Sequence, residues 1–275
     1  IKSITLPNTI TKIQDFPWKN CTDLNEVYFR SVTPPSGNFN RILYKEEGNR
    51  VPSHLLIRVP QDALSAYNYW NNAEGCYVEA SNTPWQIINQ DGYKFMINRM
   101  EHIATLLRSY KEAGNIIPTS VMIDGEAYTI TSIGYEAIIN GEYNAESIDI
   151  PNSVTKLEGN AIYGNNAIQT IVLPNSITSI GKYAFNGCSG LTSINVDARN
   201  TEYKSIDGVL FSKDGENLFQ YPAGKKVTNY IIPNSVTDIG EGAFNGCSGL
   251  TSITIPNSVT DIGEGAFNGC SGLTS

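Results

Sequence analysis

The chain repeats itself, and this repetition limits its fold more than any other feature of the sequence. Residues 233–252 and 256–275 are identical, each reading PNSVTDIGEGAFNGCSGLTS, so the repeat has a period of 23 residues. Periods of about 20–50 residues are typical of repeat proteins in which each unit forms one coil and stacks on the next. The sequence therefore predicts a solenoid.

The proline of the repeat marks the register of looser copies. The same slot is occupied in successive coils by Pro151, Pro174, Asp197, Pro233 and Pro256. These slots are separated by 23, 23, 36 and 23 residues, and the long spacing is one period plus an insertion of 13 residues. A further copy opens the chain at 1–29. Because the chain starts and stops inside repeats, we expect it to be part of a longer protein.

Each repeat contains two extended segments and a turn. The segment L-x-x-I-x-I-P predicts a short strand, because its last two apolar residues alternate. S-V-T-x-I-G predicts a second extended stretch that glycine ends, and A-F-x-G-C suits one turn of α or 3₁₀ helix. One coil cannot bury these apolar side chains alone, whereas stacked coils place each on its copy at the ~4.8 Å strand spacing. The sequence predicts a parallel solenoid with one continuous core.

The run L-T-S-I-x-I-P-N-S-V-T-x-I-G-x-x-A-F-x-G-C-S-G resembles the BspA-like leucine-rich repeat, also called the Treponema pallidum type. The resemblance covers residues 1–30 and 116–275, and the inserted segment also resembles an insertion found in that family. It implies a curved, right-handed leucine-rich-repeat solenoid. Such a solenoid has a parallel sheet on its concave side and short helical, 3₁₀ or extended turns on its convex side.

The same resemblance implies where such a protein acts. The family is carried by secreted or surface-attached proteins of anaerobic, often host-associated bacteria and of some protozoa. Its better-known members are adhesins that bind host matrix proteins or other bacteria. We therefore expect an extracellular or cell-surface location for this chain.

The stretch between the copies is expected to cap one array and open another. Residues 1–83 are predicted to be the end of a first array with a capping segment, because an uncapped coil leaves its apolar face in water. Within this cap, a short helix is predicted at Asp62–Trp70, begun by Pro60.

A second array is predicted after a connecting region. SNTPW at 81–85 is interpreted as a linker, and 84–115 as a β-rich linker or N-terminal cap with a turn at KEAGN. The pattern at 97–111 favours strand, with helix as the alternative. The second array then spans 116–275.

The insertion lies within 199–227. Alternating apolar residues flank KDGEN there, which is a hairpin turn signal. Loops on a rigid scaffold often carry function. We therefore expect an exposed hairpin with candidate binding residues Tyr203, Lys204, Lys213, Asp214 and Lys225.

Charge and hydropathy argue against two classes of function. The chain has 19 Lys and Arg against 27 Asp and Glu, for a net charge of −8. Nucleic-acid binding and electrostatic membrane binding need clustered basic residues, so neither is expected. No run approaches the ~20 apolar residues of a membrane span, so no membrane insertion is expected in this region.

Catalytic motifs are also missing. His54 and His102 are the only histidines, and neither has a Cys or carboxylate nearby at ligand spacing. The strings NGCSG lack both a nucleophile elbow and a P-loop lysine. Glu241 and Glu264 recur with the period, which indicates a solvated rim and not an acid/base pair. We expect no enzyme activity, no metal and no cofactor.

The cysteines follow the repeat as well. Cys21, Cys188, Cys247 and Cys270 occupy one slot, and Cys76 lies in the predicted cap. Equal slots predict an inward column of free thiols. A Cys247–Cys270 disulfide is disfavoured because the two side chains point in parallel directions.

A binding surface is the remaining functional feature. Alternation is expected to point the following pairs toward the concave face: Ser3 and Thr5, Glu26 and Tyr28, Ser147 and Asp149, Thr170 and Val172, Ser193 and Asn195, Asn229 and Ile231, Ser252 and Thr254. Most are small, which favours a solvated Ser/Thr ladder. The candidate binding residues among them are Glu26, Tyr28, Asp149, Thr170 and Asn195.

These features predict a non-enzymatic, monomeric binding module, and the resemblance implies that its role is adhesion. It would recognise a macromolecule, such as a host matrix or cell-surface protein, through its solenoid scaffold. One alternative is a glycan-binding module that uses the aromatic residues Trp18, Trp70, Trp85, Tyr67 and Tyr69. The other alternative is a passive stalk, which the identical coils favour because a surface tuned to one ligand would vary between coils.

Overall fold

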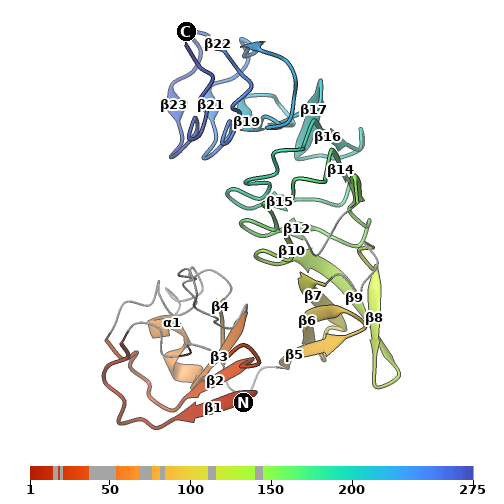
Figure 1. Ribbon diagram of the computed structural model, residues 1–275. Helices are drawn as coiled ribbons and strands as arrows, with labels where there is room; N and C mark the ends of the chain where they lie inside the picture. The colour runs from red at the N-terminus through yellow and green to blue at the C-terminus, as the bar shows by residue number, and fades with distance from the viewer. Residues whose placement is uncertain are drawn as a thin grey trace. The chain divides into compact units, whose positions relative to one another are not determined.

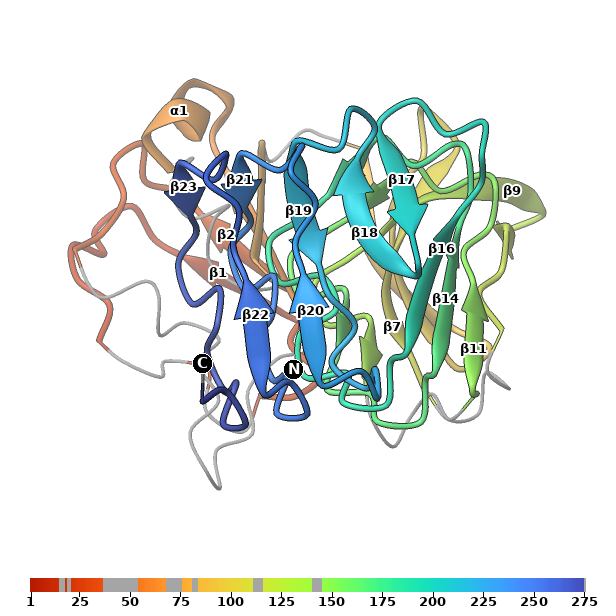
Figure 2. The ribbon, with the colours of Figure 1, turned by 90° about the horizontal axis from the view of Figure 1, so that it is seen from above.

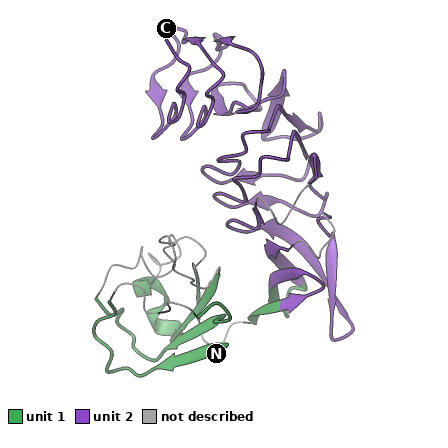
Figure 3. Cartoon of the chain, viewed as in Figure 1, with its two compact units in different colours: residues 1–88, 96–102 green, residues 89–95, 103–275 purple. Residues whose placement is uncertain are grey.

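The computed structural model describes residues 1–14, 18, 21–36, 54–67, 76–80, 84–110, 116–139 and 145–274 (Figure 1). The chain forms two compact units (Figure 3). Unit 1 comprises Ile1–Ile88 with Met96–His102, and unit 2 comprises Asn89–Phe95 with Ile103–Ser275. The boundary therefore falls within the consecutive strands β5 (Trp85–Gln90) and β6 (Tyr93–Asn98).

Unit 1 contains a parallel sheet of four strands in chain order. The strands are β1 (Ser3–Leu6), β2 (Glu26–Phe29), β3 (Leu55–Val59) and β4 (Cys76–Ala80). Side chains of β2 alternate in burial, so Val27 and Phe29 enter the core while Glu26 and Tyr28 face outward. The core also includes Trp18 and Tyr67.

The predicted helix in the capping segment is present. A 3₁₀ turn, η2 (Gln61–Ala63), follows Pro60 and continues into α1 (Leu64–Tyr67), with Asp62 in the first turn. Proline suits this start because it lacks the N–H that a helix N-terminus leaves unpaired. Residues 68–70 of the prediction lie outside the described residues.

The region for which the sequence allows either strand or helix forms strands. Residues 97–111 contain the end of β6 and β7 (Ile103–Ser109), separated by a turn in which His102 has φ 53°. Both faces of β7 are buried from Ala104 onward, as in an interior strand. KEAGN lies outside the described residues, as do 81–83 of the predicted linker, whereas Trp85 already begins β5.

Unit 2 is a parallel β-solenoid in which each coil contributes a first strand. The first strands are β11 (Ser147–Asp149), β14 (Thr170–Leu173), β16 (Ser193–Val196), β20 (Asn229–Ile231) and β22 (Ser252–Thr254). They pair as β11-β14-β16 and β20-β22, and paired residues are one period apart, as in Ile148 with Ile171 and Ile171 with Ile194 (Figure 2). The predicted repeat register is therefore the register of the sheet.

A second set of short strands lies where S-V-T-x-I-G was predicted to extend. It comprises β12 (Lys156–Leu157), β15 (Ser179–Ile180), β21 (Asp238–Ile239) and β23 (Asp261–Ile262). The remaining strands of this part are β8 (Ser120–Ile123), β9 (Glu126–Ile133), β10 (Ile138–Ile139) and β13 (Ile162–Tyr163). One sheet runs β15-β12-β9-β7-β6-β5, with β8 added antiparallel to β9.

The A-F-x-G-C segment forms hydrogen-bonded turns instead of the predicted turn of helix. In the coil of Phe185, the N–H groups of Ala184, Asn186 and Cys188 each donate to the carbonyl three residues earlier. The donors are alternate residues, so these bonds do not form the consecutive series of a helix. Tyr183, directly before this segment, has φ 57°, and Gly187 within it has φ 71°. A left-handed residue ends a helix, so two of them prevent a continuous one.

The insertion forms an antiparallel meander, with strands β17 (Tyr203–Ile206), β18 (Val209–Ser212) and β19 (Asn217–Gln220). The turn predicted at KDGEN connects β18 to β19, so the hairpin is confirmed. β19 then pairs in parallel with β21 and joins the solenoid. Much of the meander is core, because Leu210, Phe211 and Leu218 are fully buried.

Candidate binding surface

The predicted outward ladder of unit 2 has the expected register. Thr170 pairs with Ser147 on one side and Ser193 on the other, and Val172 pairs with Asp149 and Asn195. Asp149, Val172 and Asn195 are exposed, and Thr170 is half-buried. The Ser193 hydroxyl donates to Asn195 Oδ1 at 2.8 Å. The ladder therefore presents a carboxylate, an apolar side chain and an amide in one outward row.

The equivalent outward positions recur on a separate two-stranded sheet, β20-β22. Asn229 pairs with Ser252, and Ile231 pairs with Thr254. Ile231 is 74 % exposed. An exposed isoleucine flanked by small polar residues can contribute apolar contact area to a partner without forming a large hydrophobic patch.

Glu26 and Tyr28 in unit 1 share a hydrogen-bond network. The Tyr28 hydroxyl donates to Glu26 Oε2 at 2.7 Å, and Arg58 on β3 approaches Glu26 Oε1 at 3.5 Å. Glu26 as the acceptor raises the pKa of Tyr28, and partial burial adds to this effect. Arg58 also donates to the Trp85 carbonyl. The repeat pattern does not point to Arg58, because β3 lies in the segment that departs from the repeat.

The charged residues of the insertion are held by the backbone around them. Each lysine donates to a carbonyl: Lys204 to Asp214 at 3.0 Å, Lys213 to Ala198 at 3.1 Å and Lys225 to Asp207 at 2.7 Å. The Asp214 carboxylate accepts from the Glu216 N–H and the Ser212 hydroxyl, which lowers its pKa. These contacts connect the loops of the insertion to one another and to the neighbouring backbone.

Tyr203 was expected to be exposed, and this expectation is wrong. Its side chain is 7 % exposed, its ring packs 5.4 Å from that of Phe219, and its hydroxyl accepts from the Ile180 N–H at 3.1 Å. The cause is the meander, which turns β17 so that its first residue points into the core. A ligand could not reach the ring without disturbing the coil.

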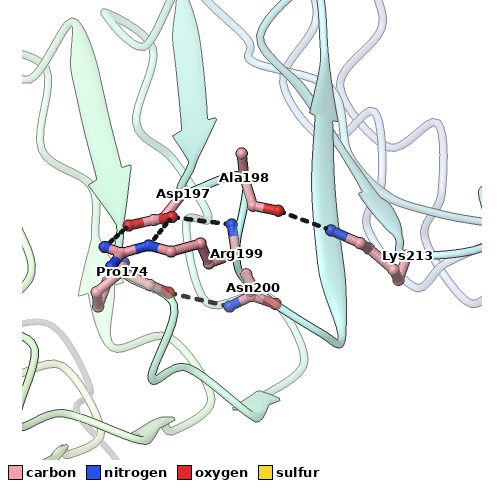
Figure 4. A network of polar contacts seen from close by, with 6 residues as sticks. All are labelled: Pro174, Asp197, Ala198, Arg199, Asn200 and Lys213. Carbon is pink, nitrogen blue, oxygen red and sulfur yellow. Dashed lines mark hydrogen bonds and ion pairs between the residues drawn. The ribbon is translucent and has the colours of Figure 1, made fainter.

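A polar network anchors the insertion to the preceding coil (Figure 4). Asp197 accepts from the Arg199 guanidinium at 2.7 Å and from the Arg199 N–H, which lowers the pKa of Asp197 to about 2. The buried Asn200 donates to the carbonyls of Pro174 and Ile177, each at 2.9 Å. Asp197 stands in the proline slot, so this network replaces the proline of an ordinary coil.

The thiols of the repeat slot are free. Cys188 and Cys247 are buried, and Cys21 and Cys270 are partly buried, as the inward column predicted. Each thiol of unit 2 points at a carbonyl of the preceding coil, as Cys188 Sγ does at Ile162 at 3.3 Å. Burial raises the pKa of Cys188 to about 11, so the thiol stays protonated at neutral pH.

The described residues contain no cluster of three or more His, Cys, Asp or Glu side chains that could hold a metal ion. His54 is buried and stacks on Tyr77 with ring centroids 6.3 Å apart. None of the helices in the described part of the chain has the length and apolar run that a membrane crossing needs.

The aromatic residues that the glycan-binding alternative depends on differ in how exposed their side chains are. Trp18 is 6 % exposed in the core of unit 1, and Tyr67 is fully buried with its hydroxyl donating to the Ser31 and Thr33 carbonyls. Trp85 is half-buried, and Tyr69 and Trp70 lie outside the described residues. Trp18 and Tyr67 therefore serve packing and cannot stack on a sugar.

The solved structures that are similar to this chain include leucine-rich repeat proteins. The pneumococcal vaccine antigen PcpA is 20 % identical over 69 % of this chain and 69 % of its own, with a TM-score of 0.37. A leucine-rich cell surface protein from Faecalibacterium prausnitzii is 21 % identical over 99 % of this chain and 65 % of its own, with a TM-score of 0.39. The T. pallidum leucine-rich repeat protein is 18 % identical over 68 % of this chain and 69 % of its own, with a TM-score of 0.32.

A comparison with curated proteins finds no match. The family model for the BspA type leucine-rich repeat region, in contrast, matches in six copies, at residues 1–39, 126–217 and 212–275. These matches cover most of the chain and coincide with the coils described above. The chain belongs to the family of BspA type leucine-rich repeats.

Proposed function

We propose that this chain is a non-enzymatic, monomeric binding module that acts outside the cell or on its surface and recognises a protein. The main observation behind this proposal is the row of outward side chains on the paired strands β11, β14 and β16 of unit 2. Asp149, Val172 and Asn195 stand side by side on neighbouring strands and are all exposed. A row of different side chains on a rigid sheet can be recognised specifically by a partner. A row of identical side chains would offer the same contacts at every strand.

The structure supports a protein ligand over a glycan. Two of the aromatic residues considered for sugar stacking, Trp18 and Tyr67, are buried in the core. The outward positions instead offer apolar contact from Val172 and Ile231 next to polar groups. This mixture is typical of transient protein interfaces.

A stalk is the second candidate, and one observation favours it. The coils at 233–252 and 256–275 are identical in sequence, which adds length without adding new surface chemistry. The two functions are compatible if the ladder of β11, β14 and β16 binds and the later coils provide reach.

We also propose segment boundaries that follow the repeat. Residues 1–83 would end a first array, 84–115 would open a second, and 116–275 would form that second array. The reason is that only 1–30 and 116–275 follow the repeat register.

The test is a binding screen of the purified chain against matrix proteins, such as fibronectin and fibrinogen, and against a glycan array. We expect saturable binding to a protein that Val172→Glu weakens by about tenfold or more, the loss of roughly 1.4 kcal/mol of binding free energy. Tyr163→Glu is the matched control, because Tyr163 is 41 % exposed but lies on β13, which belongs to a different sheet.

Three results would contradict the proposal. Equal weakening by the two variants would remove the ladder as the binding surface. Retention on glycans alone would support the sugar-binding alternative, and no binding to either class would support the stalk.

Deleting 201–226 is unsuitable as a test, because it would remove the buried Leu210, Phe211 and Leu218. Lys213→Ala and Lys225→Ala test the insertion without opening the core.

A further inference from the structure

The coil that carries the insertion is two residues short at one point. In the coil of β21, Ala243 comes four residues after Ile239. In the inserted coil, the equivalent Gln220 comes only two residues after Leu218. The two coils are in register on both sides of this point, because Leu218 pairs with Ile239 and the Tyr221 N–H donates to the Ala243 carbonyl at 2.7 Å. The missing residues are those that form the projecting turn in other coils.

The missing turn leaves a cavity between its two neighbours. The turn at Gly181–Tyr183 forms one wall and the turn at Gly240–Glu241 forms the other, while Phe219 and Gln220 form the floor. Ile180, Phe185 and Leu210 complete the lining of this cavity of about 200 Å³, which we call the notch pocket. Phe219 is only partly buried, so the floor is reached from solvent.

Two side chains span the rim of the notch pocket. Lys182 Nζ donates to Glu241 Oε1 at 2.6 Å, and the Tyr183 hydroxyl donates to the Glu264 carbonyl at 2.9 Å. The Lys182 and Glu241 side chains are 73 % and 29 % exposed, so this ion pair can exchange partners with an incoming polar group.

The floor offers one hydrogen-bond acceptor that a ligand can reach. Gln220 is 6 % exposed, and its Nε2 donates to the Tyr221 and Ala243 carbonyls at 3.0 and 3.4 Å. Within the described residues, Gln220 Oε1 accepts no hydrogen bond. This oxygen is not fully buried, so a ligand hydroxyl or a water can reach it and donate a hydrogen bond to it.

The size and lining select the ligand. A cavity of about 150 Å³ lined by apolar side chains holds benzene, and drug-sized ligands need about 300 Å³ or more, so the notch pocket fits a single ring. Its walls are mainly aromatic and aliphatic, which suits an aromatic ring better than a sugar with a hydroxyl on most of its carbons. One accessible acceptor in the floor and a charged rim suit a ring with one hydroxyl.

We propose that the notch pocket binds the phenol ring of a tyrosine side chain presented by a protein partner. The ring packs on Phe219 and Phe185, and its hydroxyl donates to Gln220 Oε1. This inference rests on the proposed function, because it supplies an aromatic anchor for the protein ligand. Tyrosine is one of the residues that most often dominate protein interfaces.

The experiment follows the methyl resonances of Ile180 and Leu210 by NMR during titration with N-acetyl-L-tyrosinamide. We expect saturable shifts, while methyls remote from the pocket, such as those of Ile148, stay in place. N-acetyl-L-phenylalaninamide should bind about tenfold more weakly, because it leaves the Gln220 acceptor unpaired. Methyl glucoside should produce no shift.

Two variants assign the effect to the pocket. Gln220→Leu should reduce the preference for tyrosine over phenylalanine amide from about tenfold to about one, because the acceptor is gone. Gln169→Leu makes the same chemical change at an exposed residue outside the cavity and should keep the preference. The thermal melting of both variants reports whether each is folded, and Phe219→Trp, which narrows the cavity, should weaken both amides.

The outcomes separate the two proposals. No shift of Ile180 and Leu210, equal binding of the two amides, or stronger binding of the glucoside would overturn the pocket assignment. Binding of free p-cresol without binding of the peptide Gly-Gly-Tyr-Gly-Gly would overturn the protein origin of the ring. A chain that binds a matrix protein while the notch methyls stay unchanged would refute this inference alone. Shifted methyls in a chain that binds no protein in the screen would contradict the proposed function.

Discussion

At the scale of a residue, Asn200 ties the inserted coil, which has Asp197 in its proline slot, to the preceding coil. Its amide donates to two carbonyls of the preceding coil, and its Oδ1 accepts from the N–H groups of Glu202 and Tyr203 at 2.9 and 2.7 Å. Asn200→Ala leaves these groups without partners in a buried site. We expect the free energy of unfolding to fall by about 2–4 kcal/mol, measured by urea denaturation followed by circular dichroism.

Asn195→Ala is the control for this prediction. Asn195 is exposed on β16, and its side chain bonds only to the neighbouring Ser193 hydroxyl among the described residues. Its loss should change stability by no more than about 0.5 kcal/mol. If the two alanine variants were equally stable, Asn200 would not hold the coils together.

At the scale of an element, the turn between β17 and β18 depends on glycine. Asp207 and Gly208 have φ 51° and 78°, the two-residue turn with positive φ that suits a hairpin. A Cβ on Gly208 would also lie 2.7 Å from Ser193 Oγ and 3.1 Å from Ser193 Cα. Gly208→Ala therefore combines backbone strain with a clash against β16, and we expect it to destabilise the chain by about 2–3 kcal/mol.

Gly246→Ala separates the two causes. Gly246 has φ 73°, but a Cβ there meets no atom within 4 Å. Its replacement should cost only the strain, about 1 kcal/mol. Urea denaturation of the two variants gives the comparison, and a larger effect at Gly246 would mean that the β17–β18 turn does not press on β16.

At the scale of the whole molecule, stability should follow the number of stacked coils. The last coil contacts its neighbour through the Gly263 N–H, which donates to the Ile239 carbonyl at 2.7 Å, and through Phe267, which stacks on Phe244 at 5.1 Å. Removing 256–275 should leave a folded solenoid, since each coil interacts with its nearest neighbours. If the interface between the last two coils contributes roughly 1–3 kcal/mol, its loss should lower the melting temperature by about 2–10 °C.

The thiols report the same truncation. Burial raises the pKa of both Cys247 and Cys270, but Cys247 is 1 % exposed and Cys270 is only partly buried. In the 275-residue chain, iodoacetamide at pH 8 should label Cys270 before Cys247, as mapped by mass spectrometry after cleavage at acidic residues. Truncation should make Cys247 the thiol of the end coil and speed its labelling. Unchanged protection of Cys247 would argue against nearest-neighbour stacking.

The sequence alone was enough to determine the coil. Its period, the alternation of each strand and the slot of each cysteine depend on local patterns that identical neighbours reinforce, so Ile148, Ile171 and Ile194 could be placed in one column. The hairpin at KDGEN was predictable for the same reason, because turn residues act locally. The outward positions of Asp149 and Asn195 followed from the period of a strand.

Tertiary structure decided what the local pattern leaves open. Strand or helix at 97–111 depended on whether β9 was available to pair with β7. The burial of Tyr203 and the approach of Arg58 to Glu26 depend on which segments cover them, and segments outside the repeat have no register from which to predict this. The notch pocket is the clearest case. The two missing residues before Gln220 can be counted in the sequence, but they become a cavity only because β19 pairs in register with β21 and full turns stand on both sides.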